Sequence, residues 1–163
     1  MRTILQDTEI RLLRPDDHVA LAPLMAEMQR HYDVPCPPTD AILAGLRECP
    51  PGVDILIAVK DRAVIGFASA CNLYPGPGLK SGFFLKEIYV AEMARDAGLG
   101  AALMKALAGL ALERGHRRID WTADADDAAL LRFYDGLGAT ALPKKLFYRL
   151  TGEALLAVAR DAD

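Results

Sequence analysis

The sequence predicts an α/β (α+β) fold, with one domain over residues 1–163 that contains about seven strands. Two observations lead to this prediction. Segments with strand and helix patterns follow one another in the order β-α-α-β-β-β-α-β-α-β-β, with no internal repeat or low-complexity segment. The 163 residues are 52% hydrophobic, which suits one sizeable core.

The first half of the chain predicts two helices and three strands from periodicity and end signals. Asp16 is expected to cap the first helix, and Thr39 or Asp40 the second. Two residues separate the second and third strands, which predicts a hairpin. The expected ranges are 8–14 for the first strand, 16–31 and 39–47 for the helices, and 53–60 and 63–71 for the hairpin strands.

The stretch from Phe84 to Gly115 carries the most informative pattern of the sequence, a strand followed by a short turn and a helix. Residues 84–90 are rich in aromatic and β-branched side chains, which favours a strand. Leucines then recur at helical spacing from Leu99, and Gly115 is expected to end that helix. Between strand and helix lies the hexapeptide Arg95-Asp96-Ala97-Gly98-Leu99-Gly100.

This hexapeptide fits the pattern R-x-x-G-x-G at the start of a helix. The first turn of a helix offers unpaired N–H groups and a positive dipole end, and glycine lets a ligand approach the backbone. A phosphate or pyrophosphate can bind there. The phosphate-loop pattern is absent, and the dinucleotide pattern G-x-G-x-x-G fails because Leu103 occupies its third glycine position. An ordinary glycine-started helix is the alternative.

The rest of the second half predicts a strand, a helix, two more strands and a terminal helix. Prolines and glycines at 72–82 predict a loop before the central stretch. The expected ranges are 117–123 for the strand, 127–137 for the helix, 140–143 and 146–150 for the last strands, and 152–161 for the terminal helix.

Charge and composition narrow the classes of partner. Nineteen basic and 22 acidic residues give a net charge of −3, which argues against general nucleic-acid binding. The three cysteines (Cys36, Cys49 and Cys71) show neither metal-ligand spacing nor a disulfide framework. No run of ~20 apolar residues predicts a membrane span, and residues 1–13 lack a signal-peptide core. We expect a cytoplasmic protein with no metal, membrane or nucleic-acid partner.

Two motifs resemble the signatures of the GNAT superfamily of N-acyltransferases. Strand 85–90 precedes R-x-x-G-x-G at 95–100, as in that family's acetyl-CoA signature, and 127–139 is similar to N-x-x-A-x-x-F-Y-x-x-x-G-[AF]. The resemblance covers nearly the whole chain and is closest to the diamine and thialysine acetyltransferase-like subgroup. It implies a GNAT-like mixed, largely antiparallel sheet with helices on both faces. It also implies an N-acetyltransferase that moves the acetyl group of acetyl-CoA directly to a primary amine of a small molecule in a ternary complex.

The resemblance further implies which residues bind acetyl-CoA. Backbone groups of the central strand would contact the pantetheine arm, and the glycine-started helix would hold the pyrophosphate. Asp127 stands where the second signature usually has Asn, and as an anion it suits phosphates less well, although it can cap its helix. The expected cofactor-binding residues are Ile88, Tyr89, Val90, Arg95, Asp96, Ala97, Gly98, Leu99, Gly100, Ala101 and Asp127.

Tyr134 and Glu87 are the expected catalytic residues. A phenol with a pKa near ~10 can return a proton to a departing thiolate with a pKa near ~8.5, and Tyr134 lies where the family places its general acid. Packing of Phe133-Tyr134 against the sheet is the alternative. Glu87 is expected to share a strand face with Leu85 and Tyr89, where burial would raise its pKa and let it deprotonate an ammonium, directly or through water. A solvent-facing carboxylate or an ion pair is the alternative for Glu87.

The acceptor amine is expected at the end of the first helix, where GNAT enzymes build their acceptor pocket. Members that acetylate polyamines or thialysine carry two adjacent acids where this chain has Lys86-Glu87, so the lysine argues against a polycationic acceptor. The expected substrate-binding residues are His31, Tyr32, Asp33 and, from the proline- and glycine-rich loop, Tyr74.

A binding module without catalytic activity is the alternative function, and a homodimer is the expected assembly. A non-catalytic acyl-CoA-binding sensor or regulatory module would keep Arg95, Gly98 and Gly100 but have no use for Tyr134. Relatives with this signature often dimerise, and the aromatic segment 146–150 is a plausible pairing edge, so we expect a homodimer.

Overall fold

The computed structural model describes residues 4–160, which fall into two compact units divided between Trp121 and Thr122. The first unit contains one sheet with the strand order β1-β2-β3-β4-β5. The first four strands are antiparallel neighbours, and β4 and β5 are parallel. The strands are β1 (Glu9–Leu12), β2 (Val53–Lys60), β3 (Ala63–Leu73), β4 (Gly82–Val90) and β5 (Ile119–Asp120). The sheet is therefore mixed and largely antiparallel, which confirms the predicted fold class.

The described residues form five strands rather than about seven, because 140–143 and 146–150 are not strands. Ladder hydrogen bonds and packed cross-strand pairs stabilise a strand. Pro143 has no N–H to donate. In the described part of the chain, no packing against a neighbouring strand stabilises the segment 146–150. Its side chains are largely exposed, at 75% for Leu146, 65% for Phe147 and 84% for Tyr148. The predicted strand 117–123 is also shorter, with only Ile119–Asp120 in the ladder.

Five α-helices are present in residues 4–160, close to their predicted ranges. The first begins later than expected because the residues before it form a 3₁₀ turn, so Asp16 is not its cap. Pro38, rather than Thr39 or Asp40, occupies the N-cap position of the second. Asp161, the expected last helical residue, lies outside the described residues. The helices are α1 (His18–His31), α2 (Thr39–Arg47), α3 (Leu99–Glu113), α4 (Ala128–Gly136) and α5 (Gly152–Arg160). The 3₁₀ turns are η1 (Ile4–Asp7), η2 (Pro15–Asp17), η3 (Pro77–Leu79) and η4 (Glu92–Ala94).

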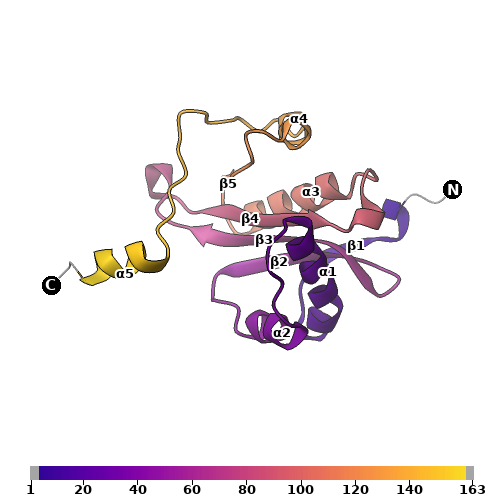
Figure 1. Ribbon diagram of the computed structural model, residues 1–163. Coiled ribbons are helices and arrows are strands. Elements are labelled where there is room, and N and C mark those ends of the chain that lie inside the picture. The colour runs from indigo at the N-terminus through magenta and orange to yellow at the C-terminus, as the bar shows by residue number, and fades with distance from the viewer. Residues whose placement is uncertain (1–3, 161–163) are drawn as a thin grey trace. The chain divides into compact units, whose positions relative to one another are not determined.

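Helices cover both faces of the sheet in the first unit, as the resemblance implied. In Figure 1, α1 and α2 lie on one side of the sheet and α3 on the other. The core between them includes fully buried Ile57 and Phe67 from the strands and Leu103 from α3. Gly66 lets α3 pack closely on β3, because an added Cβ would lie 3.2 Å from Cδ1 of Leu103 and 3.3 Å from the carbonyl oxygen of Tyr89.

Candidate active site

A β-bulge in β4 determines which side chains face α1. The register pairs Ser69 of β3 with Glu87 and Ala70 with Leu85, so Lys86 is the extra residue. Directly paired residues share a face, and neighbouring residues of β3 point to opposite faces. Glu87 and Leu85 therefore lie on opposite faces, and the expectation that they share one was wrong. A prediction from the regular alternation of side chains along a strand misses this arrangement, because the bulge inserts one residue into β4 and none into β3.

Glu87 shares its face with Tyr89, as predicted, and lies near the end of α1. The Tyr32 hydroxyl donates a hydrogen bond to Oε1 of Glu87 at 3.3 Å. Burial raises the pKa of Glu87 above its ordinary value, while the Lys86 ammonium and hydrogen bonds from Tyr32 and the Ile88 amide oppose that rise. A half-buried carboxylate with a raised pKa can accept a proton from a substrate.

Aromatic rings surround this carboxylate. The ring of His31 lies 5.1 Å from that of Tyr32 and 5.6 Å from that of Tyr89, measured between centroids. The rings of Tyr32 and Tyr89 are 6.5 Å apart. The structure therefore brings Glu87 together with two predicted substrate-binding residues, His31 and Tyr32. Asp33 follows them at a positive φ of 53°, just past the end of α1.

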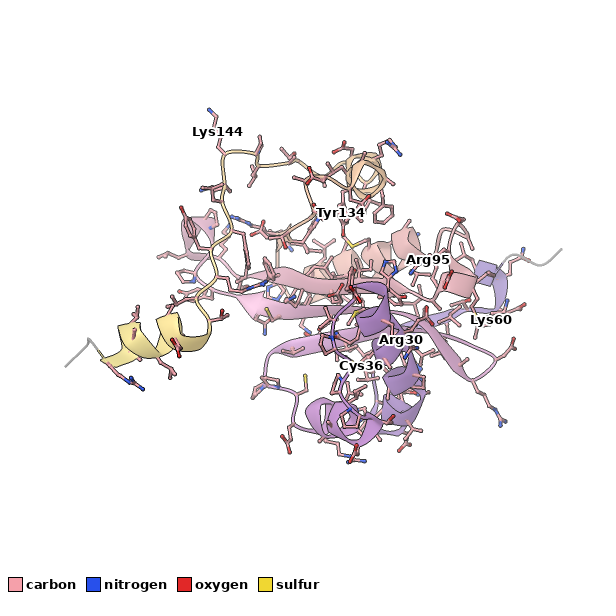
Figure 2. The ribbon with its side chains drawn as sticks, in the orientation of Figure 1. Arg30, Cys36, Lys60, Arg95, Tyr134 and Lys144 are labelled. Atoms are coloured by element: carbon pink, nitrogen blue, oxygen red, sulfur yellow. The ribbon has the colours of Figure 1, made fainter. Side chains whose placement is uncertain are left out.

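A hydrogen-bond network connects α1 to the predicted cofactor-binding segment. The Tyr89 hydroxyl donates to Oε1 of Glu27 at 3.1 Å, and the Glu92 amide donates to the same oxygen at 2.9 Å. Nη2 of Arg95 donates to the Tyr89 hydroxyl at 3.1 Å, and Nε of Arg95 donates to the carbonyl oxygen of Val90 at 3.2 Å. Burial, and next the hydrogen bond to Glu27, raises the pKa of Tyr89. Arg95, labelled in Figure 2, is thus held against the end of β4.

Glu27 is the residue of this network that the sequence reasoning missed. Its signal was a carboxylate in the apolar stripe of α1, where it follows Leu24 by three positions and precedes His31 by four. Leu24 and Met28 in that stripe are buried. A carboxylate in such a position requires partners. Tyr89 and the Glu92 amide provide them.

One edge of β4 is open beyond its first residues. Among the described residues, β5 pairs with β4 only at Phe83 and Phe84, so 85–90 has no ladder partner on that edge. Gly98 then starts α3 at a φ of +79°, a conformation that favours glycine. An added Cβ there would meet only Cδ1 of Leu5 at 3.5 Å, so the turn is not crowded. An open strand edge followed by an accessible helix start fits an extended ligand that ends in a phosphate group.

A cavity of about 410 Å³ lies between α1, α2 and the face of the sheet that carries Glu87. Ser69, the strand partner of Glu87, lines it. The described residues that line the cavity are all uncharged, and they include Met25, Met28, Ile42, Leu46 and Cys49. This uncharged lining suits an apolar part of a ligand better than a positively charged group.

The second unit contains two of the predicted site residues, Tyr134 and Asp127. Tyr134 lies on α4 and is 7% exposed, and its ring centroid is 5.2 Å from that of Phe133. Asp127 precedes α4, and its Oδ1 accepts a hydrogen bond from the Leu130 amide at 2.9 Å. The capping that the sequence allowed for Asp127 is therefore present.

Tyr74 is not brought together with His31 and Tyr32. It lies in the loop after β3, five positions beyond Ser69, roughly 16 Å along an extended chain. Tyr74 lines a different cavity together with Lys80 and Arg117.

Residues 4–160 also bear on the expectations for cysteines, metal ligands and membrane spans. The cysteines Cys36, Cys49 and Cys71 are free, and the described residues contain no group of three or more His, Cys, Asp or Glu that could hold a metal ion. None of the described helices combines the length and the apolar character that crossing a membrane requires.

Known proteins with a similar sequence or structure support one family. Residues 21–139 match the acetyltransferase (GNAT) family profile. The chain is 32% identical over 100 residues to an L-ornithine N5-acetyltransferase of Arabidopsis thaliana, a match that covers 61% of this chain and 44% of that protein's length.

Two solved structures have the same fold. An integron cassette protein from the mobile metagenome of V. cholerae superposes with a TM-score of 0.86 at 29% identity, covering 94% of this chain and 98% of that one. An aminoglycoside N-acetyltransferase in complex with CoA gives a TM-score of 0.72 at 22% identity, covering 87% of this chain and 93% of that one. The family match over residues 21–139 shows that the chain belongs to the acetyltransferase (GNAT) family.

Proposed function

We propose that this protein transfers the acetyl group of acetyl-CoA to a primary amine of a small molecule, by direct transfer in a ternary complex. The observation that carries the proposal is the placement of Glu87. The bulge turns this carboxylate toward the end of α1, where it is half-buried and accepts a hydrogen bond from Tyr32. Its raised pKa suits a group that removes a proton from an ammonium.

In the proposed reaction, acetyl-CoA supplies an activated acyl group as a thioester. Glu87 takes a proton from the substrate ammonium, directly or through water, which frees the nitrogen lone pair for attack. The new C–N bond forms as the C–S bond breaks, and the electron pair of the broken bond leaves with sulfur. Tyr134 is proposed to return a proton to that sulfur, on the strength of its place in the second family motif.

Residues of the first unit would hold the donor. The open edge of β4, with Ile88, Tyr89 and Val90, would contact the pantetheine arm, and the segment 95–101 would hold the pyrophosphate at the start of α3. Arg95 adds a positive charge at this segment, where Tyr89 and the Val90 carbonyl hold its guanidinium. Asp127 is a weaker candidate because its carboxylate already caps α4.

The acceptor would reach Glu87 from the surface formed by His31, Tyr32 and Asp33. The neighbouring cavity has an uncharged lining, and Lys86 stands beside Glu87. Both features favour an amine with one positive charge and a short or apolar chain over a polyamine. Tyr74 is proposed to contact only acceptors long enough to reach the loop after β3.

Free-thiol release from acetyl-CoA tests the function across a panel of amines, amino acids and aminoglycosides. We expect release that depends on the amine and forms the acetylated product in equal amount, with monoamines preferred over polyamines. Acetyl-CoA binding without turnover of any amine would instead support a non-catalytic acyl-CoA-binding module. Matched assays with Glu87→Gln, which keeps the side-chain shape, would connect the activity to this site.

We also propose a homodimer that works in the cytoplasm. The exposed apolar side chains of 146–150 support a contact with a second copy, although this segment is not a strand in the chain itself. The three free cysteines fit a reducing compartment. Light scattering at micromolar concentration tests the assembly, and a monomer there would contradict it.

A further inference from the structure

A second cavity of about 410 Å³ lies at the opposite end of β4 from the candidate active site. The loop between β3 and β4 and the segment before β5 form its walls, and its described polar lining residues are Tyr74, Lys80, Ser81, Arg117, Arg118 and Asp120. β4 runs from Gly82 at this cavity to Val90 near Arg95, which is about 26 Å of extended chain. Figure 1 shows the β3–β4 loop and the start of α3 at opposite ends of the sheet.

Close backbone contacts fix the shape of this cavity. The Gly76 amide donates to the carbonyl oxygen of Lys80 at 2.7 Å, which closes the loop. A Cβ at Gly76 would lie 2.7 Å from that oxygen, so a side chain there would force the loop to shift. The Phe83 amide donates to the carbonyl oxygen of Arg118 at 2.9 Å, and a Cβ at Gly82 would lie 2.9 Å from the same oxygen.

The charges that line the cavity are mostly positive. Three cations (Lys80, Arg117 and Arg118) face one carboxylate, Asp120, which leaves a net charge of +2. Asp120 neutralises Arg118, because its Oδ2 lies 2.6 Å from Nε of that side chain. Nη1 of Arg117 donates to the His116 carbonyl oxygen at 3.1 Å, and a guanidinium has further N–H groups to offer. Lys80 and Arg117 thus provide two positive charges that Asp120 does not balance.

A chain of hydrogen bonds ends at the cavity wall. Oγ of Ser81 lies 2.8 Å from Nδ1 of His116, and Nε2 of His116 lies 3.2 Å from Oδ1 of Asn72. His116 is 6% exposed, and its ring contacts Phe83 edge-on with centroids 4.5 Å apart. With the ring neutral, the Asn72 oxygen accepts from Nε2–H and Nδ1 accepts from the Ser81 hydroxyl.

This chain can reverse its direction without any change in net charge. If the Asn72 amide rotates and presents its NH₂ group to Nε2, the ring proton moves to Nδ1 and donates to Ser81. The Ser81 hydroxyl is then released to donate to a ligand in the cavity. An anion beside Lys80 and Arg117 would favour that direction, because it accepts the released O–H.

We infer that this cavity is a second binding site, for a small dianion with an apolar body, such as a phosphate monoester. The +2 charge of the lining matches a dianion, Ser81 supplies a hydroxyl donor, and Leu73, Pro75 and Pro77 provide apolar lining. The site is separate from the proposed acetyl-CoA segment and does not depend on the proposed acetyl transfer.

Phenyl phosphate is the probe that tests this site in the full chain. Backbone amide NMR should show saturable shifts in residues 74–82 and 116–120, with and without excess acetyl-CoA. Phenol, which has the ring but not the charge, should cause no saturable shift. The double variant Lys80→Gln/Arg117→Gln should weaken binding by roughly tenfold or more, and Ser81→Ala by roughly threefold.

Lys105→Gln/Arg47→Gln is the matched control, since it removes the same two charges from exposed positions outside the cavity lining. This control should bind phenyl phosphate as the wild type does. Equal weakening in the control would overturn the proposal, because binding would then follow net charge alone. Shifts confined to 95–101 that disappear with acetyl-CoA would also overturn it, because the anion would occupy the pyrophosphate site. Unchanged affinity in Ser81→Ala would remove the hydroxyl donor from the proposal.

Discussion

The two ends of β4 show how one strand can support two different kinds of site. At the Val90 end, the Tyr89 hydroxyl donates a hydrogen bond to Glu27 of α1 and accepts one from Arg95. At the Gly82 end, Lys80 and Arg117 line an open cavity. The same pairing with β3 fixes both ends, so the flanking elements create the difference. Groups that already hold one another suit chemistry that needs fixed positions, whereas unbalanced charges around a cavity suit binding.

The largest expected effect is the loss of kcat in Tyr134→Phe, which separates a role of Tyr134 in catalysis from a role in binding acetyl-CoA. Tyr134→Phe keeps the ring and removes the hydroxyl, so acetyl-CoA affinity should change little. Proton donation matters only as charge grows on the sulfur, so kcat should fall by about 10²-fold, the lower part of the range for general acid catalysis. Steady-state turnover with a confirmed acceptor measures it.

Tyr148→Phe is the matched control for this variant, because Tyr148 lies outside the proposed catalytic and acetyl-CoA-binding residues and the change keeps its ring, so kcat should stay unchanged. A Tyr134→Phe enzyme within a factor of about three of the wild type would assign Tyr134 to packing. The Val90 end of β4 would then have to contain the whole of the acid–base chemistry.

The sequence predicted the elements whose signals are local. The range of β2 and the start of α3 at Leu99 agree with the prediction, because alternation and leucine spacing are properties of short segments. The strand β3 starts at Ala63 as predicted but runs to Leu73, two residues further than expected. The bulge at Lys86 could not be predicted, since it depends on the register with β3. This one residue decides that Glu87 faces α1 and Leu85 does not.

The candidate site was predictable only where its residues belong to local sequence motifs. Motifs pointed to Glu87, Arg95 and Gly98, and the structure places all three near the Val90 end of β4. Glu27 was missed because its partners are more than 60 positions away in the sequence. Tyr74 was expected near the acceptor, and the sequence could not place it better, because a loop sequence does not show which end of the neighbouring strand the loop adjoins. The structure shows which end of the strand its loop adjoins.

The second prediction concerns Glu87 and its pH dependence. Since a general base must be ionised, activity should rise with pH through the raised pKa of Glu87. Glu87→Gln should lose this acidic limb and reduce kcat/KM by roughly ten- to a hundredfold, because water can replace part of the base. A mutant profile that retains the limb would point to another base, such as His31.

The stability of the same variant gives an independent test. A raised pKa means that the folded chain favours protonated Glu87, so this group stabilises the fold at acidic pH. That contribution is lost as the pH rises through the raised pKa. At neutral pH, Glu87→Gln should therefore be at least as stable as the wild type in thermal unfolding. A clear destabilisation at neutral pH would identify Glu87 as one partner of a structural ion pair instead.

The third prediction tests the start of α3. Gly98 has a positive φ, so its substitution would strain the backbone, whereas Gly100 lies inside the helix. Gly100→Val should block close approach of a phosphate and weaken acetyl-CoA binding by roughly tenfold in calorimetry. Gly109→Val on the same helix is the control, because a Cβ at Gly109 meets nothing within 4 Å. If both variants bind acetyl-CoA as the wild type does, the pyrophosphate lies elsewhere.

The smallest expected effect concerns Glu27, which acts through other residues. Its Oε1 accepts from both the Tyr89 hydroxyl and the Glu92 amide, and Tyr89 in turn holds Arg95. Glu27→Ala removes both acceptor contacts, so Arg95 should be positioned less firmly and the KM for acetyl-CoA should rise by about three- to fivefold, the equivalent of about one hydrogen bond. The kcat should stay nearly constant, since Glu27 touches neither the amine nor the thioester in the proposed reaction. Glu27→Gln keeps an oxygen at the same position and should restore the wild-type KM. A loss of kcat in Glu27→Ala, or no rescue by glutamine, would show that the charge of Glu27 matters directly and that it belongs with Glu87 in the acid–base chemistry.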